Sequence, residues 1–178
     1  AQINPHFLYN SFYLLNSMLL MEDYDAAGAL SRHLGAYFKY VTHTGRLYVR
    51  LNEELDQARV YLSIQQMRFQ DGLKVHFPPL PAGLDRPAIP RLTLQPLLEN
   101  AFKHAFDRID GPKEIWITYD QDDTYVYVTV QNSGPVLGPQ ELAHIQDALS
   151  FSKEQSTGLG NVHKRLVISH GTGLRIQD

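Results

Sequence analysis

Helical periodicity runs through about the first seventy residues of the chain and breaks at Gly72. Apolar side chains recur there at three- and four-residue spacing, which predicts helices over residues 6–21, 26–42 and 52–70. The first of these helices has so broad an apolar face that it needs a packing partner. The pattern therefore predicts an all-helical fold for the first part of the chain.

Two capping residues define the predicted helix starts. Asp25 is a suitable N-cap for the second helix, because its carboxylate can accept a hydrogen bond from an amide of the first turn. Asn52 is the predicted N-cap of the third helix. Glu53 and Glu54 then lie in its first turn, where the helix dipole favours negative charge.

After Gly72 the pattern changes to a mixture of strands and helices. A short strand is predicted over residues 74–77, followed by a connector that five prolines keep from being helical: Pro78, Pro79, Pro81, Pro87 and Pro90. Two alternating runs, 114–119 and 124–130, are joined by a polar turn and predict a hairpin. Further helices are predicted over residues 92–106, 139–149 and 161–169. This second part is therefore α+β, with helices packed on a mostly antiparallel sheet.

Composition excludes several classes of function. A formal net charge of −3 and a pI near 6.2 provide no basic surface for nucleic acid. The chain has no cysteine, so disulfides and thiolate metal sites are excluded. No apolar run reaches the roughly 18 residues that a membrane helix needs. Because the chain opens at Ala1 without an initiator methionine, we expect it to be a piece of a longer protein.

The first chemical motif is a histidine at the head of the first helix. Asn4 suits an N-cap and Pro5 suits the first turn, so His6 is expected at the helix start. Asn10 follows four residues later on the same face. An imidazole nitrogen of His6 can act as a nucleophile, and the Asn10 amide can hold the other nitrogen and fix the tautomer. The alternative is a partly exposed helix histidine without a chemical role.

The second motif lies on the predicted helix over residues 92–106. Asn100, Lys103 and His104 share one face of this helix, with Glu99 beside them. The amide oxygen of Asn100 can ligate Mg²⁺, which prefers hard oxygen donors and binds together with substrate phosphates. Lys103 and His104 can then meet those phosphates. The alternative is an amphipathic helix whose polar face is simply exposed to water.

Two further motifs contain glycine. Gly158 and Gly160 precede Asn161 at a predicted helix start, whose unpaired N–H groups suit a phosphate. Asn132 ends a predicted strand and can hydrogen-bond a base edge, while Gly134 leaves room for that base. Ordinary turns explain these residues equally well when each motif is taken alone. The order of all four motifs along the chain is therefore the informative feature.

In that order, the motifs resemble the LytS/YesM family of sensor histidine kinases over the whole chain. The matching segments are Pro5-His6-Phe7-Leu8-Tyr9-Asn10, Leu51-Asn52-Glu53-Glu54-Leu55, Glu99-Asn100-Ala101, Asn132-Ser133-Gly134-Pro135 and Gly158-Leu159-Gly160-Asn161. The resemblance implies a helical dimerisation and phosphotransfer region over residues 1–71. It also implies an ATP-binding α/β sandwich, of the type shared with gyrase B and Hsp90, over residues 72–178.

The resemblance assigns a role to each motif. His6 is the implied phosphoacceptor, oriented by Asn10, and Glu99 is a candidate base. Asn100 is the implied Mg²⁺ ligand in a site for ATP. The other residues implied to surround the nucleotide are Lys103, His104, Asn132, Gly134, Gly158, Gly160 and Asn161. Residues 135–156 are expected to form a lid over the ATP.

The resemblance also implies partners. One is a second copy of the chain, because the apolar face of residues 7–20 favours a four-helix bundle over packing within one chain. The other is a response regulator, whose aspartate takes the phosphoryl group from His6. A membrane is expected only through an N-terminal part that precedes this sequence, which makes the chain a cytoplasmic portion. Two alternatives are a nucleotide-binding module that does not phosphorylate itself, and an ATPase acting through Glu99 and a water.

Two features, Asn132 and the end of the chain, depart from the family pattern, and one residue, Phe7, differs from many other histidine kinases. Asn132 stands where the family has an aspartate that accepts a hydrogen bond from the adenine amino group, so weaker or less selective ATP binding is expected. Phe7 stands where many histidine kinases place an acid directly after the histidine. The chain also ends at Asp178, before the final strand that the family pattern predicts.

Overall fold

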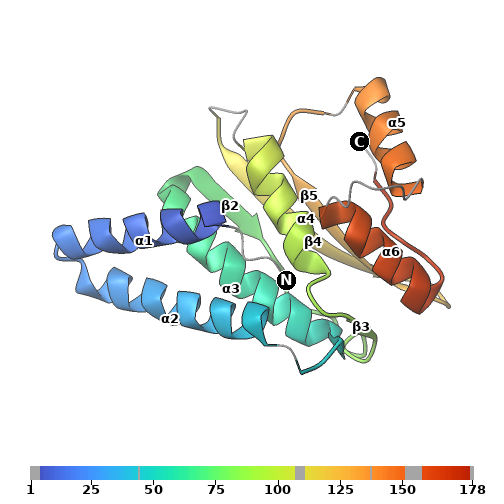
Figure 1. The fold of residues 1–178 in the computed structure, drawn as a ribbon, viewed down its shortest axis with the longest axis horizontal. Coiled ribbons are helices and arrows are strands. Elements are labelled where there is room, and N and C mark those ends of the chain that lie inside the picture. The colour runs from blue at the N-terminus through green and yellow to red at the C-terminus, as the bar shows by residue number, and fades with distance from the viewer. Residues whose placement is uncertain (1–4, 44, 107–110, 137, 151–157, 177–178) are drawn as a thin grey trace.

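Three long helices open the chain in the computed structural model, which describes residues 5–43, 45–106, 111–136, 138–150 and 158–176. They are α1 (Pro5–Leu20), α2 (Tyr24–Thr42) and α3 (Leu51–Phe69), and they confirm the three predicted helices. The helices α1 and α2 form a hairpin that extends to the left in Figure 1, with α3 alongside it. Asn4, the predicted cap of the first helix, lies outside the described residues.

The predicted N-cap of α2 is wrong by two residues. The carboxylate of Asp23, not that of Asp25, accepts a hydrogen bond from the backbone N–H of Ala26 at 3.1 Å. Asp25 lies within the first turn instead. The earlier start follows from the tight connection after α1, where Glu22 has a φ of +60° and reverses the chain within two residues.

The predicted cap of α3 is also wrong. The helix begins at Leu51, so Asn52 is already inside it. A short strand, β1 (Tyr48–Arg50), runs directly into the helix and leaves no room for a capping turn. The carboxylate of Glu53 instead accepts a hydrogen bond from the backbone N–H of Arg50 at 3.3 Å, which closes the first turn.

Three strands form the main sheet in the order β2-β4-β5. They are β2 (Leu73–His76), β4 (Lys113–Gln121) and β5 (Val126–Asn132). Strands β4 and β5 form the predicted antiparallel hairpin, while β2 pairs parallel to β4. Outside this sheet, β1 pairs antiparallel with β3 (Ala88–Pro90), a strand that the prolines of this segment concealed. The β1–β3 pair links the helical part to the α/β part.

The remaining helices lie in the second half of the chain. They are α4 (Leu94–Asn100), α5 (Pro139–Ser150) and α6 (Gly158–His170), and a 3₁₀ turn, η1 (Gln70–Gly72), joins α3 to β2. Helix α4 passes directly into one π-helical turn, η2 (Ala101–Ala105). In Figure 1, α4 and α6 lie on the same side of the sheet. Among the described residues, no helix combines the length and apolarity that crossing a membrane requires.

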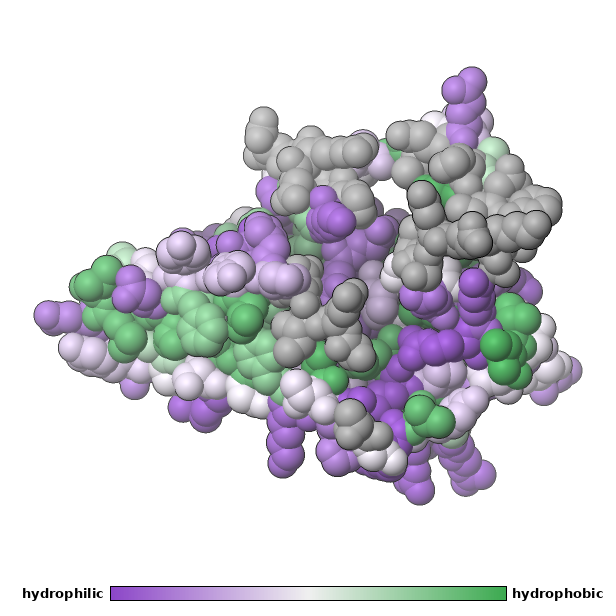
Figure 2. Space-filling model, viewed as in Figure 1, coloured by the Kyte–Doolittle hydropathy of each residue, from purple (hydrophilic) through white to green (hydrophobic). Residues whose placement is uncertain are grey.

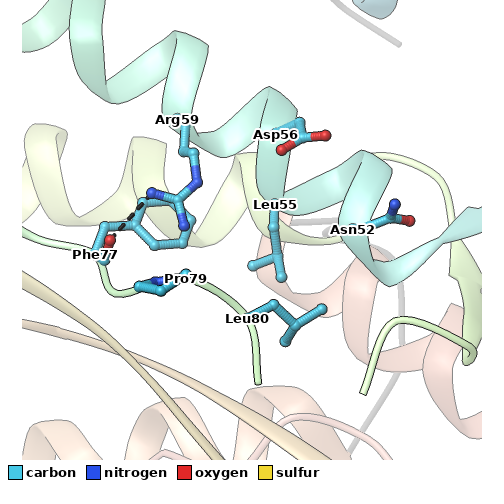
Figure 3. Close-up of a pocket in the computed structure, with 7 residues that line it drawn as sticks. All are labelled: Asn52, Leu55, Asp56, Arg59, Phe77, Pro79 and Leu80. Atoms are coloured by element: carbon cyan, nitrogen blue, oxygen red, sulfur yellow. Dashed lines mark hydrogen bonds between the residues drawn. The ribbon is translucent and has the colours of Figure 1, made fainter. Parts of the chain in front are cut away.

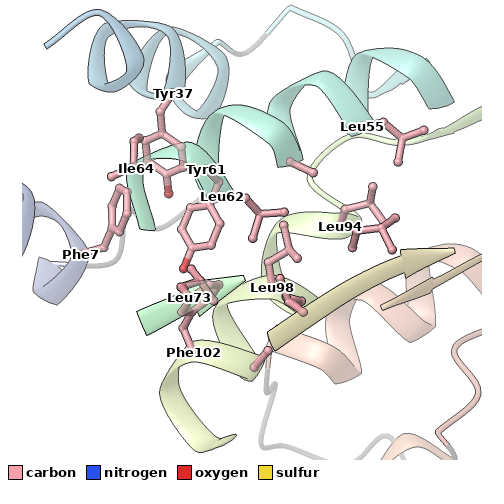
Figure 4. Packing of buried hydrophobic residues seen from close by; sticks show 14 of the residues in the cluster. Phe7, Tyr37, Leu55, Tyr61, Leu62, Ile64, Leu73, Leu94, Leu98 and Phe102 are labelled. Atoms are coloured by element: carbon pink, nitrogen blue, oxygen red, sulfur yellow. The ribbon is translucent and has the colours of Figure 1, made fainter. Parts of the chain in front are cut away.

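One hydrophobic core extends from α1 to the sheet (Figure 4). Its most completely buried side chains come from α2, α3, α4, η2 and β4, and they include Leu30, Tyr37, Tyr61, Leu62, Leu98, Phe102 and Ile115. Residues on both sides of position 71 therefore pack into the same core. This shared core fixes how the helix that begins at Pro5 lies relative to α4.

Candidate functional site

His6 is exposed in the first turn of α1, one turn before Asn10. The side-chain nitrogen of Asn10 lies 3.2 Å from Nε2 and 3.4 Å from Nδ1 of His6. The amide nitrogen is therefore nearly equidistant from the two imidazole nitrogens. This geometry agrees with the predicted pairing of the two side chains on one helix face.

Phe7, the next residue, is buried and holds the start of α1 in place. Its ring centroid lies 4.8 Å from that of Tyr37 on α2 and 5.2 Å from that of Tyr61 on α3. Tyr61 in turn meets Phe102 of η2 edge-on at 5.7 Å. Figure 4 shows these rings between the three helices. A chain of aromatic contacts thus runs from the neighbour of His6 to the turn that follows Asn100.

Glu99 is half-buried on the side of α4 that faces α2 and α3. The Gln95 amide donates to the Glu99 carboxylate at 2.8 Å and lies 3.2 Å from the hydroxyl of Tyr37. Burial raises the pKa of Glu99, and the hydrogen bond from Gln95 offsets part of that rise. Burial and, to a lesser degree, the charge of Glu99 raise the pKa of both Tyr37 and Tyr61. Such a carboxylate is a better proton acceptor than one in water.

Asn100 and Lys103 are both exposed at the C-terminal end of α4 and in η2. The backbone changes from α- to π-helical after Asn100, so the predicted common face with Lys103 and His104, which assumed α-helical spacing, does not apply unchanged. The side chain of His104 is not among those that the structure describes. Single π-helical turns occur frequently at functional sites, because they redirect the side chains that follow.

The glycine motif around Gly158 opens α6 and lies against α4. A Cβ atom added to Gly158 would lie 3.5 Å from the Cβ of Pro96, so the two helices approach closely at this point. Gly160 and Asn161 occupy the first turn of α6. Gly158 is thereby brought beside the helix that carries Asn100.

The strand-end motif lies at the end of β5. Asn132 is the last residue of this strand. The following Ser133 is held to β4 because its backbone N–H donates to the carbonyl of Glu114 at 2.9 Å and its hydroxyl accepts from the N–H of Glu114 at 2.8 Å. Gly134 continues this turn. The expected lid, residues 135–156, contains α5, while its residues 137 and 151–156 lie outside the described part.

A shallow groove of about 360 Å³ lies elsewhere, between α3 and residues 77–80 (Figure 3). The guanidinium of Arg59 covers the Phe77 ring at 3.8 Å and donates to its carbonyl at 3.0 Å. None of the residues predicted for the functional site lines this groove. The candidate site therefore has two parts: α4, η2 and the start of α6, which are in contact through α4, and the end of β5.

From the sequence, Glu54 was expected only as an acidic residue in the first turn of α3, and its contacts with the start of α4 were missed. Its side chain is buried and accepts hydrogen bonds from the residues that open α4. Arg165 of α6 donates to the same segment. No periodicity signals these contacts, because they join residues far apart in the chain.

Comparison with known proteins matches both halves of the chain. The family model described as "Histidine kinase" covers residues 1–73, and that of "Histidine kinase-, DNA gyrase B-, and HSP90-like ATPase" covers residues 85–178. The sensor histidine kinase YesM of Bacillus subtilis is 32% identical over 99% of this chain and 30% of its own length. The sensor protein LytS of the same organism is 32% identical over 94% of this chain and 28% of its own.

An uncharacterised sensor-like histidine kinase of Staphylococcus epidermidis is 29% identical over 98% of this chain and 34% of its own length. The chain thus spans about a third of the length of these curated relatives. The two family models follow one another along the chain in the order in which the four motifs occur. On these matches, the chain belongs to the LytS/YesM family of sensor histidine kinases.

Proposed function

We propose that this chain is the cytoplasmic catalytic portion of a membrane-anchored sensor histidine kinase in a bacterial two-component system. It transfers a phosphoryl group from ATP to His6, and then from His6 to an aspartate of a response regulator. The observation that carries the proposal is the aromatic contact series through Phe7, Tyr61 and Phe102. That series ties the start of α1, with His6, to the helix that bears Glu99 and Asn100.

The nucleotide is proposed to bind along α4, η2 and the start of α6. Asn100 presents an exposed amide, and Mg²⁺ held there with the nucleotide supplies charge neutralisation at the transferring phosphoryl group. The first turn of α6 lies at the positive end of the helix dipole, which favours the negative charge of phosphates. The residues proposed to complete the site are Lys103, His104, Asn132, Gly134, Gly158, Gly160 and Asn161. Asn132 would meet adenine through an uncharged amide.

Asn10 is proposed to set which nitrogen of His6 reacts. With its nitrogen toward the ring, the amide donates to an unprotonated imidazole nitrogen and occupies the lone pair that a nucleophile needs. A half-turn of the amide presents its oxygen, which accepts the proton of one ring N–H and leaves the lone pair of the other nitrogen open. We assign the second orientation to the reactive state.

Glu99 is the proposed proton acceptor. The imidazole of His6 becomes positively charged as its nitrogen bonds to phosphorus, and the ring must then lose its N–H proton. Phe7 cannot accept it, and an amide such as Asn10 cannot either. Burial raises the pKa of Glu99, so its carboxylate binds a proton more readily than an exposed one. Most of the rate enhancement is proposed to come from positioning.

Dimerisation is proposed to use the apolar surface of α1. Phe7 is buried within the chain, but other large apolar side chains of this helix and of the turn after it remain exposed: Tyr9, Phe12, Tyr13, Leu19, Leu20 and Met21. We call these six residues the α1 stripe. Figure 2 shows apolar surface over the α1–α2 hairpin. Because the residues of the α1 stripe lie on one helix and the turn after it, the stripe favours a four-helix bundle formed with a second copy of the chain.

Incubation with γ-labelled ATP and Mg²⁺ tests the proposal, with His6→Gln and Asn100→Ala as variants. We expect an acid-labile, base-stable label on the wild type only. A wild type that binds ATP but stays unlabelled would favour the non-phosphorylating module. Release of phosphate at an unchanged rate by His6→Gln would favour the ATPase that acts through Glu99 and a water.

A further inference from the structure

Glu54 is a buried carboxylate, only 2% exposed, on the side of α3 that faces α4. One of its oxygens accepts the backbone N–H of Leu92 at 2.7 Å. The other accepts the N–H of Thr93 at 2.9 Å and that of Leu94 at 3.2 Å. The hydroxyl of Tyr40 donates to the same carboxylate. Among the residues that the structure describes, no salt bridge involves Glu54, but its charge also acts on the guanidinium of Arg165.

The three amides run into the start of α4: those of Leu92 and Thr93 precede the helix, and that of Leu94 is its first N–H, which has no partner within the helix. A side chain at the residue before a helix usually caps the first turn, but Thr93, which holds that position, makes no such bond. Glu54 therefore caps α4 from a different helix. The position of the first turn of α4 is consequently tied to α3.

Arg165 holds the same turn from the opposite side. Its guanidinium donates to the carbonyl of Arg91 at 2.6 Å and to the carbonyl of Leu92 at 2.8 Å. Leu92 has a φ of +59°, a left-handed conformation that a leucine rarely adopts without support. The N–H of Leu92 is bound by Glu54 and its C=O by Arg165, so both polar groups of this residue are fixed from outside.

We propose that Glu54 and Arg165 are positioning residues for the nucleotide site. Together with residues 91–94 they form what we call the α4 clamp, which sets α4 relative to α3 and to α6. Asn100 lies six residues beyond Leu94, and Gly158 opens the helix that carries Arg165. The clamp therefore connects the helical region to both proposed phosphate-binding motifs. The inference rests on the proposed nucleotide site.

The carboxylate restricts the position of α4 more strictly than an apolar side chain would. Removing its charge from water is costly, and this cost is offset only when the hydrogen bonds to Glu54 are made. A carboxylate that must receive three amides and a hydroxyl therefore favours one arrangement of α4.

Glu54→Gln is the decisive variant, and Glu53→Gln is its matched control. Both replace a glutamate of the first turn of α3, but Glu53 contacts Arg46 and the N–H of Arg50 rather than α4. The side-chain amide introduced by Glu54→Gln would present a donor to backbone amides that need an acceptor. We expect the dissociation constant of Mg-ADP to rise about tenfold in Glu54→Gln and in Arg165→Lys. A change of this size corresponds to the loss of one charge-assisted hydrogen bond. For Glu53→Gln we expect a change below about twofold.

Hydrogen exchange of the α4 amides, measured without nucleotide, provides the second readout. We expect faster exchange from Leu94 to Asn100 in Glu54→Gln and in Arg165→Lys, but not in Glu53→Gln. Unchanged Mg-ADP affinity would overturn the proposal even if exchange accelerates, because Glu54 would then be a structural cap alone. If the wild type binds no Mg-ADP, the proposed function fails first. The positioning role, which rests on that function, fails with it, and the exchange of α4 then reports only whether Glu54 is a structural cap.

Should Glu54→Gln not fold, Tyr40→Phe takes its place. This variant removes a single donor to the carboxylate and leaves the three amide contacts intact. The same two readouts apply, with a smaller expected rise of about threefold in the dissociation constant. An affinity for Mg-ADP equal to that of the wild type, in a folded Tyr40→Phe protein with unchanged α4 exchange, would overturn the proposal.

Discussion

Replacing Phe7 with alanine should release the start of α1, and with it His6, from the rest of the protein. Phe7 is 5% exposed and is the only large apolar side chain of α1 that is fully buried. Its transfer from water contributes about 1.5–3 kcal/mol, and its two aromatic contacts about 0.5–1.5 kcal/mol each. We therefore expect Phe7→Ala to lower the free energy of unfolding by about 3–5 kcal/mol. A loss of about 3 kcal/mol corresponds to about 6–12 °C in Tm for a chain of this size.

Urea unfolding, followed by circular dichroism at a concentration where the protein is monomeric, measures this loss. Phe12→Ala is the control, since it makes the same chemical change on the same helix at a side chain that is 56% exposed. We expect it to cost less than about 1 kcal/mol. Equal losses in the two variants would refute the reasoning, because they would show that α1 is not anchored through Phe7.

Two further predictions concern Glu99 and the α1 stripe. Burial raises the pKa of Glu99 above its ordinary value of 4.5. Glu99 therefore costs the wild type no stability at a pH below 4.5, and the free energy of unfolding falls as the pH rises through the raised pKa. Glu99→Gln should thus be more stable than the wild type at about pH 7, and a gain that persists unchanged at about pH 4 in urea unfolding would contradict this. In the α1 stripe, Leu20→Glu should shift the protein to a monomer in analytical ultracentrifugation, whereas Ile168→Glu, at a side chain on α6 that is 84% exposed, should not.

Elements with a long repeating pattern could be predicted from the sequence. The helices α1, α2 and α3 and the β4–β5 hairpin were expected within a few residues of their observed bounds, because each repeats its apolar spacing over several turns or alternations. The pairing of His6 with Asn10 follows from the same periodicity. Local patterns thus predicted the elements and those site residues that neighbour one another on one helix.

Features that depend on contacts distant in sequence could not be predicted. Strands β1 and β3 have three residues each, too few for a period, and Pro90 argues against a strand. Glu54 resembles any acidic residue in a first helical turn until α4 is packed against it. The π-helical turn after Asn100 is likewise set by packing, and it alters the spacing on which the predicted shared face relied.

The pairing of β1 with β3 restricts where the junction can lie in a hybrid between this protein and a related kinase. A hybrid kinase with its junction at residue 72 would take Tyr48–Arg50 from one parent and Ala88–Pro90 from the other, although these strands share one hydrogen-bonded register. The backbone N–H of Leu51 also donates to the carbonyl of Pro87 at 2.9 Å across that junction. Hybrids that exchange residues 5–176 as a single cassette take both partners of these bonds from one parent, so the unit suited to exchange is larger than either of the two family-matched segments.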